Sequence, residues 1–275
     1  MGEFSWLDWT WHPDALLVEL FLVAIYLLGI GPLRRRFQWS GIVEHRFLIR
    51  FAAGIAVLVI AEHSPLHALS ETYFFSAHMV QHLLIILIVP PLLLLGTPPW
   101  LMRPLLRIRY IESVVRLFTR PVIAFCAFNL TLILWHFPEF YDLALRSHNV
   151  HLLEHGMLMG TALIAWWPIL SLVREIPRLS YPLQMLYLFL QTLPMGFLGA
   201  ILVFSTVSIY ETYSYSSTLW GMEPLLDQQI GGLLMKVGGG FGFLGVLGVV
   251  FFRWFTAEEV SPDPVSIERE IQYDS

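Results

Sequence analysis

Seven long apolar stretches recur along the 275-residue chain, and they constrain its fold more than any other feature. A helix needs about 20 mostly apolar residues to cross the hydrocarbon core of a bilayer. The stretches cover residues 15–31, 47–61, 73–95, 121–137, 150–172, 183–207 and 230–255. Membrane-spanning strands would alternate apolar and polar residues, and these runs do not alternate. We therefore expect an all-α integral membrane bundle of seven transmembrane helices.

The composition excludes several other classes of protein. Charged residues make up 13% of the chain and hydrophobic residues 56%, whereas a soluble domain carries about 25% charged residues. The net charge of −5 and the lack of a dense basic tract give no indication of nucleic-acid binding. With Cys126 as its only cysteine, the chain can form neither an intrachain disulfide nor a cysteine-based zinc site.

Arginine placement predicts the orientation in the membrane, because cytoplasmic loops are enriched in basic residues. Fourteen arginines flank the cytoplasmic ends of the predicted spans: Arg34, Arg35, Arg36, Arg46, Arg50, Arg103, Arg107, Arg109, Arg116, Arg120, Arg174, Arg178, Arg253 and Arg269. The opposite side has only Arg146. We expect the N-terminus outside, the C-terminus in the cytoplasm, and a multi-pass protein of the cytoplasmic membrane. Residues 1–255 form the transmembrane domain, and the acidic segment 256–275 is expected to be a disordered cytoplasmic tail.

Nine of the ten histidines fall on the predicted outer side: His12, His63, His67, His78, His82, His136, His148, His151 and His155. Two pairs, His78 with His82 and His151 with His155, have the four-residue spacing that places both rings on one helix face. Their helices enter the membrane from the same side, so the two pairs can share one metal ion near the outer surface. Alternatively, each pair hydrogen-bonds to backbone or water inside the bundle.

Imidazole suits zinc, copper, iron and nickel, and the nearby thioethers of Met79, Met157 and Met159 favour copper. These methionines could equally well serve in packing. Glu154 lies between the two histidines of the second pair. It could orient an imidazole as an outer-shell acceptor or face an aqueous funnel.

Other functions of the same residues stay open at this point. One histidine from each pair could ligate the iron of a haem b in a membrane electron carrier. Lys236, the only lysine, lies within the seventh stretch and could carry retinal in a light-driven pump or sensor. A proton-coupled transporter could use the same histidines.

Several motifs occur together in one order. They are His78-Met-Val-Gln-His82-Leu-Leu, Pro90-Pro-Leu-Leu-Leu-Leu-Gly-Thr-Pro98, His136-Phe-Pro, Tyr141-Asp142, His151-Leu-Leu-Glu-His155, Trp166-Trp-Pro168 and Asp227-Gln-Gln-Ile-Gly-Gly232. Their order and spacing resemble those of the multi-spanning CtaG family, which is associated with assembly of bacterial haem-copper cytochrome c oxidases. The resemblance covers approximately residues 76–235.

The resemblance implies an oxidase assembly factor rather than an enzyme, with cytochrome c oxidase subunits and the lipid bilayer as partners and copper handled at the outer face. On this interpretation the metal ligands are His78, His82, His151 and His155. Five further residues would act in an outer shell or as gating groups: Glu154, Asp227, Gln228, Gln229 and His136.

Overall fold

The computed structural model describes residues 4–7, 9–40, 42–214 and 219–259, which contain helices and no strands. The α-helices are α1 (Pro13–Leu28), α2 (Arg34–Phe37), α3 (His45–His63), α4 (Pro65–Thr72), α5 (Phe75–Leu83), α6 (Val89–Gly96), α7 (Pro99–Leu106), α8 (Arg109–Phe118), α9 (Pro121–Trp135), α10 (Pro138–Arg146), α11 (His148–Leu170), α12 (Tyr181–Phe204), α13 (Glu211–Ser214), α14 (Pro224–Leu233) and α15 (Gly240–Glu259). Three π-helical segments continue neighbouring helices: η1 (Gly29–Leu33), η2 (Leu84–Ile88) and η4 (Leu234–Gly239). A short 3-10 turn is η3 (Leu219–Gly221). The all-α prediction is confirmed for this part of the chain.

Each of the seven predicted stretches is helical over most of its length. By length and composition, four of the helices can cross a membrane: Pro13–Phe37, Phe75–Gly96, Tyr181–Phe204 and Pro224–Ala257. The number rises to six if two bent pairs each form one span. These pairs are α3 with α4, bent by 44°, and α8 with α9, bent by 67°. The chain is therefore a membrane protein by its helices, and the count of seven spans stays a prediction.

Helix α11 covers the remaining predicted stretch, and it is 23 residues long. Its first half carries His151, Glu154 and His155, whose polarity lowers the mean hydropathy of the whole helix. The helix lies in the middle of the bundle, where it packs against α6 and α9. The helix that carries these three polar residues thus lies among the other helices of the bundle.

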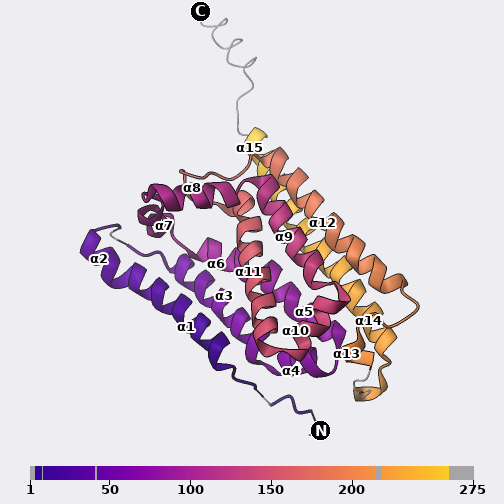
Figure 1. Ribbon diagram of the computed structural model, residues 1–275. Coiled ribbons are helices and arrows are strands. Elements are labelled where there is room, and N and C mark those ends of the chain that lie inside the picture. Colours follow the sequence, from indigo (N-terminus) through magenta and orange to yellow (C-terminus); the bar gives the residue numbers. More distant parts are fainter. Residues whose placement is uncertain (1–3, 8, 41, 215–218, 260–275) are drawn as a thin grey trace, which may run out of the picture.

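The ends of the bundle differ in the elements that cover them (Figure 1). Helices α4, α10 and α13 lie at the end where α1 begins, and α7 and α8 lie at the other end, where α15 finishes. We call the α4–α10–α13 end the polar end, because the candidate site described below lies near it. The predicted tail, residues 256–275, continues α15 as far as Glu259 and otherwise lies outside the described residues.

The helix that carries His78 and His82 passes through two consecutive prolines without a break. Pro90 and Pro91 lie inside this helix, where each proline lacks the N–H of a helical hydrogen bond, directly after a π-helical turn. The π-helical turn η2 precedes them and joins α6 to α5 as one helix. This continuous helix packs against α3 and α11.

Close approach of α14 to its neighbours depends on two glycines. A Cβ atom at Gly231 would collide with the ring of Phe75, and one at Gly232 would lie 2.8 Å from the Gly199 carbonyl oxygen. The missing side chains therefore let α14 pack closely on both α5 and α12. This packing brings the start of α14 to the first turn of α5.

Candidate metal centre

Helix α5 contributes two imidazoles that face each other. His78 and His82 lie one turn apart, and both are buried. Their Nε2 atoms are 2.7 Å apart, which is a hydrogen-bond distance, so the two rings share a single proton in this arrangement. The spacing along α5 predicts this shared face, and the structure agrees.

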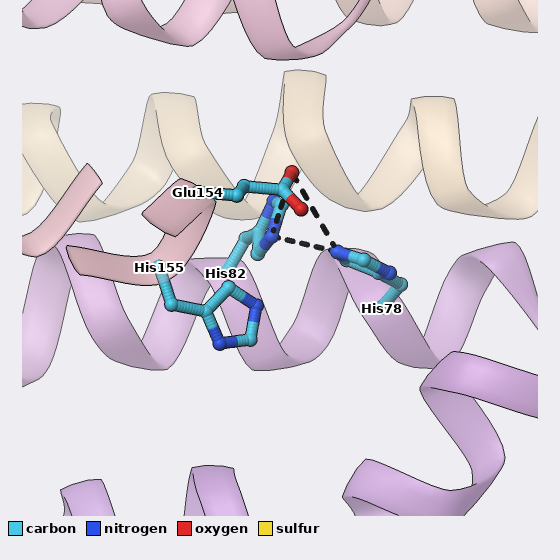
Figure 2. Close-up of side chains that lie close together, drawn as sticks. All are labelled: His78, His82, Glu154 and His155. Atoms are coloured by element: carbon cyan, nitrogen blue, oxygen red, sulfur yellow. Dashed lines mark hydrogen bonds and ion pairs between the residues drawn. The ribbon is translucent and has the colours of Figure 1, made fainter. Parts of the chain in front are cut away.

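Helix α11 brings Glu154 and His155 to the same place (Figure 2). Glu154 Oε1 lies 3.5 Å from His82 Nε2 and 4.0 Å from His78 Nε2. Each of the four side chains offers one nitrogen or oxygen atom, and these donor atoms all lie within 4.8 Å of one another. We call His78, His82, Glu154 and His155 the buried cluster.

Several polar atoms of the buried cluster have no hydrogen-bond partner among the described residues. They include both carboxylate oxygens of Glu154 and Nε2 of His155. Glu154 is 0% exposed, so water does not solvate its carboxylate from outside. A buried carboxyl group whose oxygens lack hydrogen-bond partners is costly, and a bound cation would give these oxygens a partner. The cluster therefore has the features of a candidate metal site: it is buried, it contains nitrogen and oxygen donors, and several of its polar atoms have no hydrogen-bond partner among the described residues.

Glu62, near the end of α3, orients the imidazole of His155. The His155 ring donates its Nδ1–H to this carboxylate, with distances of 2.9 Å to Oε1 and 3.1 Å to Oε2. With the proton on Nδ1, the lone pair is on Nε2, which is the atom that a metal would need. Sequence analysis missed Glu62, although an acidic residue followed by His63 at the end of an apolar stretch was a visible signal.

His151, predicted as a fourth ligand, lies beside the buried cluster and outside its four-donor group. Its Nδ1 donates to Glu71 Oε1 of α4 at 2.8 Å. The His151 ring centroid is 4.2 Å from that of His155 and 5.4 Å from that of His78. Glu154, predicted to be an outer-shell residue or to face an aqueous funnel, is fully buried and takes the place among the donors that the prediction gave to His151.

His136 lies just after α9 and points its Nδ1–H at the Leu132 carbonyl oxygen, 2.7 Å away. Its ring centroid is 6.2 Å from that of His82. The carbonyl oxygen of His136 accepts a hydrogen bond from the Tyr210 hydroxyl at 3.1 Å. Burial raises the pKa of the Tyr210 phenol, so this hydroxyl stays protonated and keeps donating. His136 therefore lines the neighbourhood of the buried cluster without joining it.

The three polar residues at the start of α14 bind backbone groups and lie apart from the buried cluster. Asp227 accepts hydrogen bonds from the N–H groups of Phe75 at 2.6 Å and Ser76 at 3.2 Å, so it caps α5 from a neighbouring helix. Gln228 accepts from the Ile209 N–H at 2.7 Å. Gln229 donates to the Ser205 carbonyl oxygen at 3.2 Å. Asp227 thus holds the start of α5, which carries two residues of the cluster, whereas Gln228 and Gln229 hold the segment that follows α12.

The geometry argues against a haem at this place. A haem iron with two histidine ligands needs the porphyrin plane between the two rings. Across the α5–α11 interface, the imidazole centroids of His78 and His155 are 5.9 Å apart, and those of His82 and His155 are 5.2 Å apart. These separations are similar to those of two axial imidazoles, but the donor atoms gather with a carboxylate oxygen of Glu154 within 4.8 Å of one another, which suits one small ion better than a haem iron.

The retinal alternative fails on the position of Lys236. This side chain is exposed on the surface of the bundle, with Nζ 5.9 Å from the ring centroid of Phe204. Asp227, the acidic residue nearest to it in the sequence, is occupied by the first turn of α5. A Schiff base on Lys236 would therefore face away from the interior of the bundle.

The sequence of the chain is similar to those of known proteins. A family described as the cytochrome c oxidase caa3 assembly factor, Caa3_CtaG, matches residues 24–257. The uncharacterized proteins Mb0105 of Mycobacterium bovis and MT0111 of Mycobacterium tuberculosis are each 26% identical to the chain in an alignment 243 residues long that covers 81% of this chain. The alignment covers 36% of each relative, so the chain spans about a third of their length. No solved structure matches the chain.

The family match covers nearly all of the helical bundle, including α5, α11 and the four residues of the buried cluster. The motifs that resemble the CtaG family at the sequence level fall within the matched residues. The chain therefore belongs to the Caa3_CtaG family of cytochrome c oxidase assembly factors.

Proposed function

We propose that this protein supports the assembly of a haem-copper cytochrome c oxidase by binding copper in the buried cluster and passing it to an oxidase subunit. The observation that carries the proposal is the fully buried carboxylate of Glu154, which faces three imidazoles and has no hydrogen-bond partner among the described residues. A protein that only needed a stable core would fill this position with an apolar residue. On this proposal the protein acts as an assembly factor and catalyses no reaction.

Copper fits the donor set better than the other metals that imidazole accepts. Nitrogen donors bind divalent copper more tightly than zinc, iron or nickel. Thioethers favour the cuprous state, and Met79 is buried on α5, next to His78 in the chain. His151 stays a proposed ligand, because its Nε2 has no hydrogen-bond partner in the described part of the chain and its ring touches that of His155. It would join the ion once its contact with Glu71 opens.

The proposal includes the topology that the arginines predict. With α11 counted beside the six candidate spans, the bundle has seven spans, and its polar end faces the outside of the cytoplasmic membrane. An odd number of spans is consistent with α1 beginning and α15 finishing at opposite ends of the bundle. Arginines gather at the end formed by α2, α7 and α8, as cytoplasmic ends do.

The binding step is tested with purified full-length protein in detergent and Cu(I) supplied from a chromophoric chelator. We expect one ion per protein at the buried cluster, and we expect its affinity to fall by more than about 100-fold when His78, His82, His151 and His155 are all replaced by alanine. His45→Ala is the matched control, because His45 is exposed at the start of α3, outside the cluster. Equal Cu(I) affinity of the wild type and the four-alanine variant would contradict copper binding at this site.

The role in assembly is tested in the host cell. Deleting the gene should lower the copper content and the activity of the terminal oxidase, and added copper should restore part of both. The His45→Ala variant should complement the deletion, and the four-alanine variant should not. Full complementation by the four-alanine variant would show that assembly does not use these histidines.

A further inference from the structure

A second group of ligand-type side chains lies beside the buried cluster, nearer to solvent. His12 directly precedes α1, and His67 and Glu71 stand four residues apart on α4. Each of the three offers one donor atom, and these atoms lie within 4.8 Å of one another. The set shares no residue with the buried cluster. We call His12, His67 and Glu71 the outer triad.

The outer triad has free donor atoms. In the described part of the chain, Nε2 of His12 and Nε2 of His67 have no hydrogen-bond partner, although both atoms are buried. The side chain of His67 is 4% exposed, and its Nε2 is 3.4 Å from Glu71 Oε2, which is longer than a charge-assisted hydrogen bond. The His12 ring meets the His67 ring edge to face, with centroids 4.8 Å apart. The donor atoms of two imidazoles and a carboxylate therefore lie close together, and neither imidazole Nε2 has a hydrogen-bond partner among the described residues.

Binding of a metal at His67 Nε2 requires the ring proton on Nδ1, and Gln81 makes this possible. The Gln81 amide nitrogen lies 2.9 Å from His67 Nδ1, which leaves the proton on Nε2. In this orientation the single hydrogen of the Ser70 hydroxyl faces two acceptors, the His67 carbonyl oxygen at 2.7 Å and Gln81 Oε1 at 2.5 Å. Turning the amide over lets Gln81 accept from His67 Nδ1 and donate to Ser70 Oγ. It gives up the bond to the Ala61 carbonyl oxygen, and because two acceptor oxygens would then face each other, the amide must also move away from Ala61.

The outer triad is connected to the buried cluster through His151. Glu71 accepts from His151 Nδ1 at 2.8 Å, and the His67 and His151 rings stack with centroids 5.5 Å apart. On its other side, the His151 ring is 4.2 Å from His155. Glu71 is the most accessible member of this series, with 30% of its side chain exposed, whereas His151 and His155 are buried. The series thus runs from the protein surface to the buried cluster.

We propose that His12, His67 and Glu71 form a second metal site, for a divalent transition-metal ion with a preference for nitrogen and oxygen donors, and that this site loads the buried cluster through His151. Two imidazoles and one carboxylate suit Cu²⁺ and Zn²⁺. Ions from solution reach this site first because it lies nearer to water. The loading role rests on the proposed function of the buried cluster, and the second metal site does not.

The test uses full-length protein in detergent, titrated with Cu²⁺ and followed by electron paramagnetic resonance. We expect two tight ions per protein in the wild type. His12→Gln and Glu71→Gln should each leave one ion, with affinity at the outer triad lowered by about 100-fold or more. His78→Ala with His82→Ala should also leave one, with the spectrum of the outer triad. His12→Gln is the safer variant for folding, because His12 is partly exposed and makes no hydrogen bond to a neighbouring helix with its Nε2.

The outcomes separate the two proposals. Two ions retained in both His12→Gln and Glu71→Gln would overturn the second site. One ion in the wild type, lost in His12→Gln and kept when His78 and His82 are replaced, would support the outer triad and contradict the buried cluster. One ion with the reverse behaviour would overturn the outer triad and support the buried cluster.

The loading role has its own measurement. After mixing with Cu²⁺, His12→Gln should fill the buried cluster roughly tenfold more slowly than the wild type, with an unchanged equilibrium affinity at the cluster. His45→Gln, which changes an exposed histidine in the first turn of α3, is the control and should load at the wild-type rate. Equal loading rates in His12→Gln and the wild type would overturn the relay.

Discussion

Helix α11 has two halves that meet the same bundle with different chemistry. From Leu158 onward its buried residues are apolar, and Trp166 Nε1 donates to the Ile86 carbonyl oxygen at 2.8 Å. Before Leu158 the helix buries Glu154 and His155 just as completely, yet both leave polar atoms without hydrogen-bond partners among the described residues. The two halves are therefore equally buried, but they differ in whether their buried polar atoms have hydrogen-bond partners.

We interpret this difference as one of function: the apolar half of α11 stabilises the bundle, and the polar half serves the proposed metal binding. Apolar packing around Leu158, Ala162 and Trp166 stabilises the bundle by close contact. Each buried polar atom left without a partner costs about 1–3 kcal/mol. The polar half of α11 thus lowers the stability of the protein without ligand, and a metal ion would recover that free energy on binding.

The first prediction replaces the buried acidic residue in the polar half of α11 by an apolar one. Glu154→Leu should lower copper affinity by about 1000-fold, or about 4 kcal/mol, because it removes both a donor and the charge that compensates the ion. The same change should leave the metal-free protein as stable as the wild type or more stable, because an unpartnered buried carboxylate is gone. Competition titration and denaturant unfolding in mixed micelles measure the two effects.

Glu139→Leu is the control for this variant, because Glu139 is an exposed carboxylate of α10 outside both groups of donors. It should change neither quantity. If the Glu154→Leu protein keeps wild-type copper affinity, or unfolds more readily without metal, the polar half of α11 does not have a metal-binding role distinct from the stabilising role of the apolar half.

The second prediction concerns the apolar half. Trp166→Ala should lower the free energy of unfolding by about 3–5 kcal/mol, because it leaves a cavity in the core. Copper affinity of the folded fraction should stay within about threefold of the wild type, which is under 1 kcal/mol. Phe252→Ala, at a position 67% exposed on α15, is the matched aromatic control and should unfold almost as the wild type does. A large loss of copper affinity in Trp166→Ala would show that the halves are coupled.

Part of this comparison was accessible from the sequence. Long apolar runs predict where the helices lie, and the four-residue spacing predicts that His78 faces His82. Spacing along one helix says nothing about how that helix is rotated against another. The rotation of α11 toward α5 brings Glu154 close to His78 and His82 and turns Nδ1 of His151 toward Glu71, and sequence analysis predicted neither contact.

The partners that sequence analysis missed come from the segment between the predicted stretches 47–61 and 73–95. Glu62 is the second-last residue of α3, and Glu71 lies on α4, which follows after a bend of 44°. Ser64 caps α4 by accepting from the Leu66 N–H at 3.3 Å, and Pro65 occupies its first turn. This Ser-Pro pair is a local signal for a new helix. Its folding back against α5 and α11 depends on tertiary packing, which no local signal contains.

The third prediction tests the support that α3 gives to the polar half. Glu62→Leu should lower copper affinity by about 10–100-fold, because His155 loses the acceptor that keeps its proton on Nδ1. Glu62→Gln should recover most of that loss, since its amide oxygen can still accept from Nδ1. A role in packing alone would give the opposite order, because leucine suits a buried position better than glutamine. Equal affinities of the two variants would contradict the orienting role.

The last prediction uses a buried polar residue that is satisfied. Asp227 is 2% exposed, like the residues of the buried cluster, but its carboxylate accepts from the Phe75 and Ser76 N–H groups. We expect a buried polar residue to have a structural role when its hydrogen-bonding groups have partners. Asp227 should therefore affect stability more than metal binding. Asp227→Ala should lower the free energy of unfolding by about 1 kcal/mol and speed amide exchange in the first turn of α5.

Copper affinity should fall less than tenfold in Asp227→Ala, because His82 lies beyond the first turn of α5 and the His78 N–H has its own acceptor, the Phe74 carbonyl oxygen. Asp227→Asn is the matched control and should retain most of the capping, because asparagine is as good a cap as aspartate. A loss of copper affinity in Asp227→Ala as large as that expected for Glu154→Leu, with stability unchanged, would mean that α14 belongs to the metal site. Hydrogen bonding would then no longer distinguish the buried polar residues that bind metal from those that only support the fold.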